Sequence, residues 1–207
     1  MKVALLVATV LVALADWWSR WKDDARVERW AKPLATIGVI GLALVSGAPG
    51  DRVAVAVVAL VLCLAGDVFL MPMLDKFVLG LASFLLGHLV FIVLFVKYGL
   101  DNPTLGGIAL MMAAVLIASV GMVVVKGAAA KDRALKTPVL AYLCVISAMA
   151  AVGWATGLPW VIAGSTLFVV SDAVLGYRQF VQARPWMPVA IMVTYHGAIA
   201  SLALSLW

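Results

Sequence analysis

The chain has few charged residues, few histidines and few cysteines. Only 12% of its 207 residues are charged, whereas roughly a quarter of the residues of a soluble domain are charged. Hydrophobic residues make up 66% of the chain, and the mean hydropathy is +1.14. These values exclude an ordinary soluble domain. Both cysteines, Cys63 and Cys144, lie inside apolar runs without metal-ligand spacing, which predicts small core residues.

The positive charge of the chain is spread over several short loops. The net charge is +5 at pH 7, but the Lys and Arg residues form no continuous basic surface. This distribution is typical of a topology signal in a membrane protein, and we expect no nucleic-acid partner.

The apolar runs have the length of membrane-spanning helices. A helix needs about 20 residues to cross a bilayer core of about 30 Å. On that basis the sequence predicts an all-α, polytopic integral membrane protein whose single membrane domain, residues 1-207, has eight transmembrane helices. The predicted spans are residues 1-18, 33-47, 53-74, 77-98, 104-125, 138-153, 158-177 and 187-207.

The first run has some features of a secretory signal peptide, because Lys2 precedes an apolar stretch that ends in Ala13-Leu14-Ala15. Five basic residues follow between Arg20 and Lys32, and their export would oppose the positive-inside rule, so we expect this run to be retained.

The loops after the first, third, fifth and seventh spans hold 12 of the 15 Lys and Arg residues. We therefore expect a protein of the bacterial inner (cell) membrane with both termini outside the cytoplasm.

Four titratable side chains interrupt the apolar runs: Asp67, His88, Asp172 and His196. A carboxylate at bilayer depth costs roughly 2.5–3.5 kcal/mol, so an intramembrane acid indicates a functional site. We expect the four side chains to share one cavity. The other eight acidic residues fall in hydrophilic stretches or at the ends of apolar runs, where we expect water to reach them.

Three landmarks recur in the two halves of the chain. Pro33 and Asp67 recur 105 residues later as Pro138 and Asp172, and each half has one histidine in its last span. The pattern is consistent with a four-plus-four parallel repeat, an arrangement that often places a site between the repeats. Coincidence in a low-complexity apolar sequence is the alternative.

Several motifs resemble those of the YhhN-type lysoplasmalogenase family. Residues 66–71 read GDVFLM, residues 77–88 read FVLGLASFLLGH and residues 171–175 read SDAVL. Lys32-Pro33 and residues 138–142 match further landmarks of the family. The similarity runs through nearly the whole chain.

The resemblance implies an eight-helix membrane hydrolase that cleaves the vinyl ether bond of lysoplasmalogens into a fatty aldehyde and a glycerophospho-alcohol. It implies Asp67 and Asp172 as catalytic candidates, a lysophospholipid-like substrate and membrane lipids as partners, and no cofactor. In the last span, residues 195–199 read YHGAI, where family members more often have Tyr-Tyr-x-Ala-Gln. The resemblance therefore carries no role over to that helix.

Vinyl ether hydrolysis requires a proton for the double bond and an anion that stabilises the resulting cation. Two carboxyl groups in a low-dielectric site can divide these tasks, because one stays protonated while the other stays ionised. The sequence leaves open which of Asp67 and Asp172 is the acid. His88 is a candidate for proton relay. Lys32, Tyr142 and His196 are candidates for binding the phosphate, a neighbouring hydroxyl or the attacking water.

Structural roles are the alternative for the same residues. The aspartates can tie helices together, the histidines can form interhelical hydrogen bonds, and Lys32 can extend to the membrane interface.

Two other functions also remain open. The two aspartates and two histidines are acceptable zinc ligands for a metal-dependent hydrolase, although none pairs with another at helical spacing. Acids and histidines within spans also suit a proton- or cation-coupled transporter.

Overall fold

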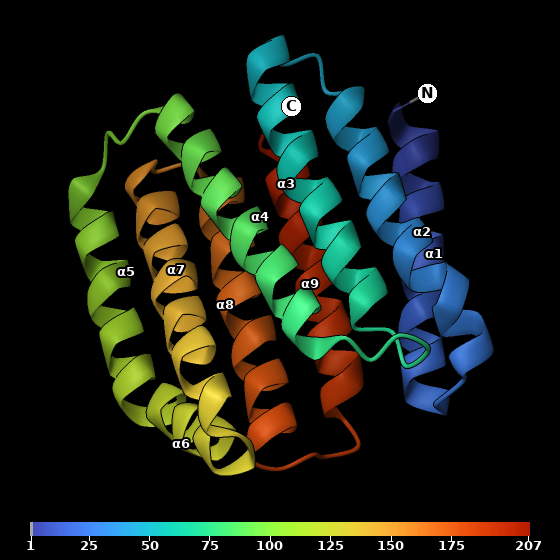
Figure 1. The fold of residues 1–207 in the computed structure, drawn as a ribbon. Coiled ribbons are helices and arrows are strands. Elements are labelled where there is room, and N and C mark those ends of the chain that lie inside the picture. Colours follow the sequence, from blue (N-terminus) through green and yellow to red (C-terminus); the bar gives the residue numbers. More distant parts are fainter. Residues whose placement is uncertain (1) are drawn as a thin grey trace.

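The computed structural model describes residues 2–207, and these residues form a bundle of long helices without a β-strand (Figure 1). The helices are α1 (Lys2–Lys22), α2 (Ala25–Leu44), α3 (Gly50–Phe69), α4 (Phe77–Tyr98), α5 (Pro103–Leu116), α6 (Met122–Lys131), α7 (Lys136–Ala155), α8 (Pro159–Phe180) and α9 (Met187–Leu204). A short π-helix, η1 (Ile117–Gly121), joins α5 to α6, and a 3-10 turn, η2 (Arg133–Leu135), precedes α7.

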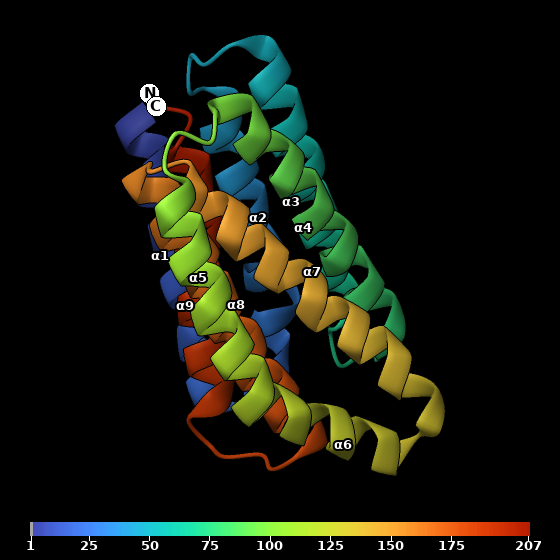
Figure 2. The same cartoon turned by 90° about the vertical axis from the view of Figure 1, so that its left-hand side faces the viewer.

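The π-helix marks a bend in an otherwise continuous helix. The segment from Pro103 to Lys131 is helical throughout, and Figure 2 shows α6 turned away from the direction of α5. Eight helical rods therefore correspond to the eight predicted spans, with α5, η1 and α6 as one rod. A π-helix inserts an extra residue into a turn, and such insertions are frequent at functional sites.

Seven of these rods are long and apolar enough to cross a membrane, which confirms a polytopic, all-α membrane protein. The exception is α2, whose first turns carry several charged residues, Glu28 and Lys32 among them. The sequence predicted a span over residues 33-47 in this region. That α2 crosses the membrane stays a prediction.

The boundaries of the third span differ from the prediction. The span was expected to run over residues 53-74, but α3 begins at Gly50 and ends at Phe69, and a loop follows. The helix therefore begins earlier and ends earlier than predicted, and Asp67 lies in its last turn. In α8 the chain continues as a helix for eight residues beyond Asp172.

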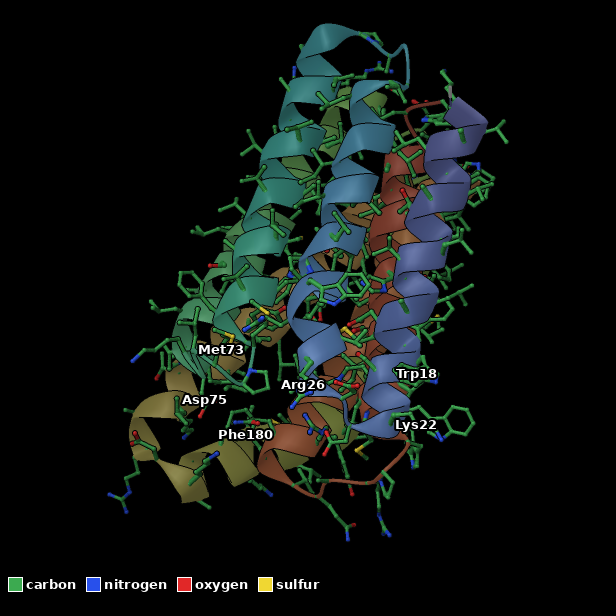
Figure 3. All side chains as sticks on the ribbon, turned by 90° about the vertical axis from the view of Figure 1, so that its right-hand side faces the viewer. Trp18, Lys22, Arg26, Met73, Asp75 and Phe180 are labelled. Atoms are coloured by element: carbon green, nitrogen blue, oxygen red, sulfur yellow. The ribbon has the colours of Figure 1, made fainter. Side chains whose placement is uncertain are left out.

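The two ends of the bundle differ in charge. Both termini lie at one end (Figure 1), where the Lys2 ammonium donates to the Ser46 carbonyl at 2.7 Å and lies 4.6 Å from the centre of the Trp207 ring. Lys97 pairs with Asp51 at the same end, at 2.7 Å. The opposite end, called the basic end below, carries the turns after α1, α3, η1–α6 and α8. Figure 3 shows Trp18, Lys22, Arg26, Met73, Asp75 and Phe180 at this end.

The most enclosed helix is α9, which packs against α1, α2, α3 and α8. Small residues allow other helices to approach closely. A side-chain carbon added at Gly87 of α4 would lie 3.3 Å from the Ala59 carbonyl oxygen of α3, which is tighter than an ordinary contact.

Cys63 is buried as predicted, but Cys144 is exposed on the outer surface of α7, so the prediction of a core role is wrong for Cys144.

Helix packing follows the same order in the two halves. In the first half, α1 packs on α2, α2 on α3 and α3 on α4; in the second, α5 packs on α7, α7 on α8 and α8 on α9. The four-plus-four repeat remains a prediction, and a superposition of residues 33–98 on residues 138–203 tests it.

Candidate active site

Asp67 is buried among hydrogen-bond donors from two other helices. Its side chain is 1% exposed, and its Oδ2 accepts hydrogen bonds from the Thr36 hydroxyl and the Tyr195 hydroxyl, both at 2.7 Å. The Lys32 ammonium lies 3.6 Å from Oδ1, which has no hydrogen-bond partner among residues 2–207. Lys32 itself is buried, so its cation does not extend to the interface. These donors and the cation all stabilise a negative charge on Asp67.

Asp172 lies in a less polar environment on α8. Its Oδ2 accepts a hydrogen bond of 2.5 Å from the Tyr142 hydroxyl of α7. The His88 Nε2 is 3.9 Å from the same oxygen, which is too far for a hydrogen bond. The Asp172 side chain keeps 14% of its surface exposed, so it remains accessible to a ligand.

Two cavities meet at Asp172. The apolar cavity, about 790 Å³ including its open mouth, lies between α4, the η1 bend, α7 and α8. Its wall includes Phe77, Leu81, Ile117, Val139, Leu143 and Phe180. The charged cavity, about 550 Å³ including its mouth, is lined by Arg20, Glu28, Lys32, Asp67, Asp172 and Arg178. Asp172 belongs to both walls, together with Leu70, Phe84 and Leu175.

The aspartates share the charged cavity, but the two histidines line neither cavity. His88 is fully buried against the rings of Tyr142 and Phe168, and neither of its ring nitrogens has a hydrogen-bond partner among residues 2–207. His196 accepts a hydrogen bond at 2.9 Å from the Trp17 indole N–H. The expectation that all four residues share one cavity is therefore wrong. The rings of Phe168 and Tyr195 form a series of contacts from His88 to His196.

Tyr142 was expected to bind the phosphate or its neighbouring hydroxyl, but its hydroxyl donates to Asp172 and its ring borders the apolar cavity. A role in positioning Asp172 fits this geometry better. Lys32 does line the charged cavity, where it faces Asp67.

Sequence reasoning missed four charged residues around the charged cavity. Asp16 is 0% exposed and Glu28 is 6% exposed, although both were expected to be reached by water. Arg20 forms an ion pair with Glu28, and Arg178 lines the same cavity. The signal was present in the first helix, because the buried residues Thr9, Ala13, Asp16 and Ser19 recur at helical spacing on one face.

Asp16 is the most deeply buried of the missed acids. Neither carboxylate oxygen has a hydrogen-bond partner among the described residues. Among the charged groups around it, Lys32 has the largest electrostatic effect on Asp16, and Lys32 also acts on Asp67. One buried cation therefore stabilises the negative charge of two buried acids.

Within residues 2–207, no three His, Cys, Asp or Glu side chains are grouped closely enough to bind one metal ion. The four zinc ligands considered from the sequence do not converge on one point.

The chain is similar in sequence to known proteins. Two curated relatives, both named lysoplasmalogenase, come from Mycobacterium bovis (strain ATCC BAA-935 / AF2122/97) and Mycobacterium tuberculosis (strain CDC 1551 / Oshkosh). Each is 31% identical over 124 residues, which are 59% of this chain and 48% of the relative. The chain thus spans about half the length of these relatives.

No solved structure matches the chain significantly. The sequence profile of the YhhN family, however, matches residues 27–206, which include α3, α4, α7, α8 and α9 with both aspartates. The chain therefore belongs to the YhhN family.

Proposed function

We propose that the protein is a membrane-embedded hydrolase that cleaves the vinyl ether bond of lysoplasmalogen-type lysophospholipids. The products are a fatty aldehyde and a glycerophospho-alcohol. Membership of the YhhN family and the lysoplasmalogenases of the two mycobacteria support this assignment.

The observation that carries the proposal is the position of Asp172 where the apolar and charged cavities meet. A lysoplasmalogen has a hydrocarbon chain on one side of its vinyl ether and a charged headgroup on the other. The hydrocarbon chain fits the apolar cavity, and the headgroup fits the charged cavity. The vinyl ether then lies beside the Asp172 carboxyl group.

The two aspartates take different roles in this proposal. Asp172 has one hydroxyl donor, and no Lys or Arg among residues 2–207 lies within ion-pair distance of it, so it holds the catalytic proton. Asp67, with two hydroxyl donors and Lys32, carries the negative charge. The separation of one acid and one anion is the arrangement that two-carboxylate glycosidases use.

The reaction then proceeds in three steps. Asp172 transfers its proton to the vinyl carbon remote from oxygen, and the adjacent carbon and oxygen share the resulting positive charge. Water adds to that carbon and passes a proton to a carboxylate, while the negative charge of Asp67 stabilises the cation. The hemiacetal then breaks its bond to the glycerol oxygen, which leaves with a proton as the alcohol, and the aldehyde forms. Asp172 becomes the acid again when it takes up the proton released by water, so the cycle needs no other proton donor.

Aldehyde release tests the proposal directly. Purified protein in detergent should release fatty aldehyde from a lysoplasmalogen but no fatty acid from the acyl lysophospholipid of the same headgroup, because protonation of carbon requires the vinyl ether. Aldehyde is measured by coupling to a dehydrogenase, and fatty acid by mass spectrometry. Absence of product from both lipids would refute the proposed activity.

The lipid enters the apolar cavity sideways from the bilayer. An open apolar groove, about 1110 Å³ including its mouth, runs along α5, α7 and α8. The groove and the apolar cavity share Leu116 and Val169, so these side chains form the wall between them. Leu116 directly precedes the η1 bend, where the regular hydrogen bonding of α5 changes.

The proposed location is the bacterial inner membrane, with the basic end in the cytoplasm. A reporter fused after Trp207 should therefore give an extracytoplasmic signal, since the positive-inside rule places the Lys- and Arg-rich loops inside. Paired alkaline phosphatase and fluorescent-protein fusions measure this, with a fusion after Gln182 in the α8–α9 loop as the cytoplasmic control. A cytoplasmic signal after Trp207 would reverse the orientation.

A further inference from the structure

Arg178 is a cation on the wall of the charged cavity, and it has no ion-pair partner among residues 2–207. It lies in the last turn of α8 and is partly buried. It forms no hydrogen bond or ion pair with any side chain that the structure describes, although Arg20, Glu28 and Asp23 are near enough to influence it electrostatically. A guanidinium group has five donors in a fixed fork, so an unpaired one at a cavity wall is available to a ligand.

The other two cations of this cavity are already engaged. Arg20 forms an ion pair with Glu28, and Lys32 lies 3.6 Å from an Asp67 oxygen. When Asp172 holds a proton, as the proposed reaction requires, Glu28 and Asp67 are the remaining negative charges on the wall. Among the side chains on the wall, three cations then face two anions. Asp16, which is not on the wall, is also influenced by Lys32, so Arg178 is the wall cation that remains for an anionic ligand group.

The position of Arg178 along α8 suits a particular part of the ligand. Six residues separate it from Asp172, which is about 9 Å along the helix axis. In a lysophospholipid the three glycerol carbons separate the sn-1 oxygen from the phosphate. If the vinyl ether lies at Asp172 and the headgroup lies in the charged cavity, the phosphate is positioned toward the basic end, where Arg178 lies. Figure 3 shows that end, with Phe180 in the same last turn of α8.

We propose that Arg178 binds the phosphate of the lysophospholipid and makes the phosphate a requirement for tight binding. The guanidinium fork matches two phosphate oxygens, which gives a stronger and more directional contact than a single ammonium. This inference rests on the proposed function, because the reacting bond is placed at Asp172. Arg178 is thus a specificity-determining residue, and the ligand class is a phosphate ester with one hydrocarbon chain.

Binding, rather than catalysis, tests this inference. The probes are an acyl lysophosphatidylethanolamine, which has no vinyl ether, and the monoacylglycerol with the same chain, which has no phosphate. Isothermal titration calorimetry of the full chain in detergent should give at least about tenfold tighter binding of the phospholipid. Arg178→Gln should reduce that ratio to about one, while Arg178→Lys should retain part of it, because a charge remains without the fork.

The control variant is Arg184→Gln. Arg184 is exposed in the α8–α9 loop, where it bonds to Gln182, and it lines neither cavity. Its loss should leave the ratio unchanged. Glycerophosphoethanolamine and inorganic phosphate are added as competitors. Displacement of the lipid by glycerophosphoethanolamine alone supports a headgroup site, whereas equal displacement by inorganic phosphate would overturn the headgroup assignment in favour of a free-phosphate site.

Two results would refute the role of Arg178. Equal affinity of wild-type protein for phospholipid and monoacylglycerol would exclude a phosphate requirement, and an unchanged ratio in the folded Arg178→Gln and Arg178→Lys variants would exclude Arg178. Failure of the proposed activity looks different, because phosphate-selective binding would persist without aldehyde release from a lysoplasmalogen.

Discussion

Asp172→Asn should lower the kcat for aldehyde release by about 10²–10⁴-fold, the usual contribution of a general acid. An amide has no acidic proton for the vinyl carbon, but its oxygen can still accept the hydrogen bond from the Tyr142 hydroxyl that Asp172 accepts at 2.5 Å. The substrate contacts in both cavities remain, so KM should change little. The measurement is a steady-state assay of aldehyde release in detergent.

The matched control is Asp101→Asn. Asp101 is exposed in the α4–α5 loop at the end of the bundle that carries the termini, far from either cavity. It should retain wild-type kcat and KM. A folded Asp172→Asn variant that kept more than about a tenth of the wild-type kcat would exclude Asp172 as the general acid. Asp67 would then be the next candidate.

Lys32→Met should destabilise the folded protein by about 3–5 kcal/mol, the range expected when one partner of a buried ion pair is removed. Lys32 is 5% exposed and lies 3.6 Å from Asp67, and it is also the main cation acting on buried Asp16. Its removal leaves Asp67 without its ion-pair partner and weakens the electrostatic stabilisation of Asp16. Unfolding by a denaturing detergent, followed by circular dichroism, measures the loss of stability.

A second substitution separates the charge effect from a packing effect. Lys32→Met combined with Asp67→Asn removes one uncompensated charge and should recover part of the lost stability, with a coupling energy of about 0.5–3 kcal/mol, as is typical of residues in contact. Lys22→Met, an exposed lysine at the end of α1, is the control and should change stability by less than about 0.5 kcal/mol. Equal losses in the single and double variants would show that the Lys32–Asp67 pair does not stabilise the fold.

Much of the fold follows from local sequence patterns. Apolar runs near 20 residues predicted the eight helical rods, because a chain in lipid must satisfy its backbone hydrogen bonds internally. The end of α3 was predicted wrongly. The length needed to cross a bilayer placed it at residue 74, but the helix ends at Phe69. The apolar residues after Phe69 continue the hydrophobic run but form the turn and loop that lead to α4.

The candidate site was only partly predictable. Asp67 and Asp172 stand out because a carboxylate is costly within an apolar run. Asp16 and Glu28 did not stand out, because Asp16 is at the end of an apolar run and Glu28 is next to Arg29 in the sequence. Only the packing of α1, α2 and α9 against one another buries them. Arg178 was likewise ordinary in the sequence, as a basic residue near the end of a span.

The sequence by itself determined the fold class, the membrane environment and the two acids, because each depends on the cost of placing a polar group in hydrocarbon. Only the tertiary structure decided the partners of those acids. Asp67 meets Lys32, Thr36 and Tyr195 from two other helices, and Asp172 lies where an apolar and a charged cavity join. These contacts join residues far apart in the chain, and the crossing of helices, which no local pattern encodes, brings them together.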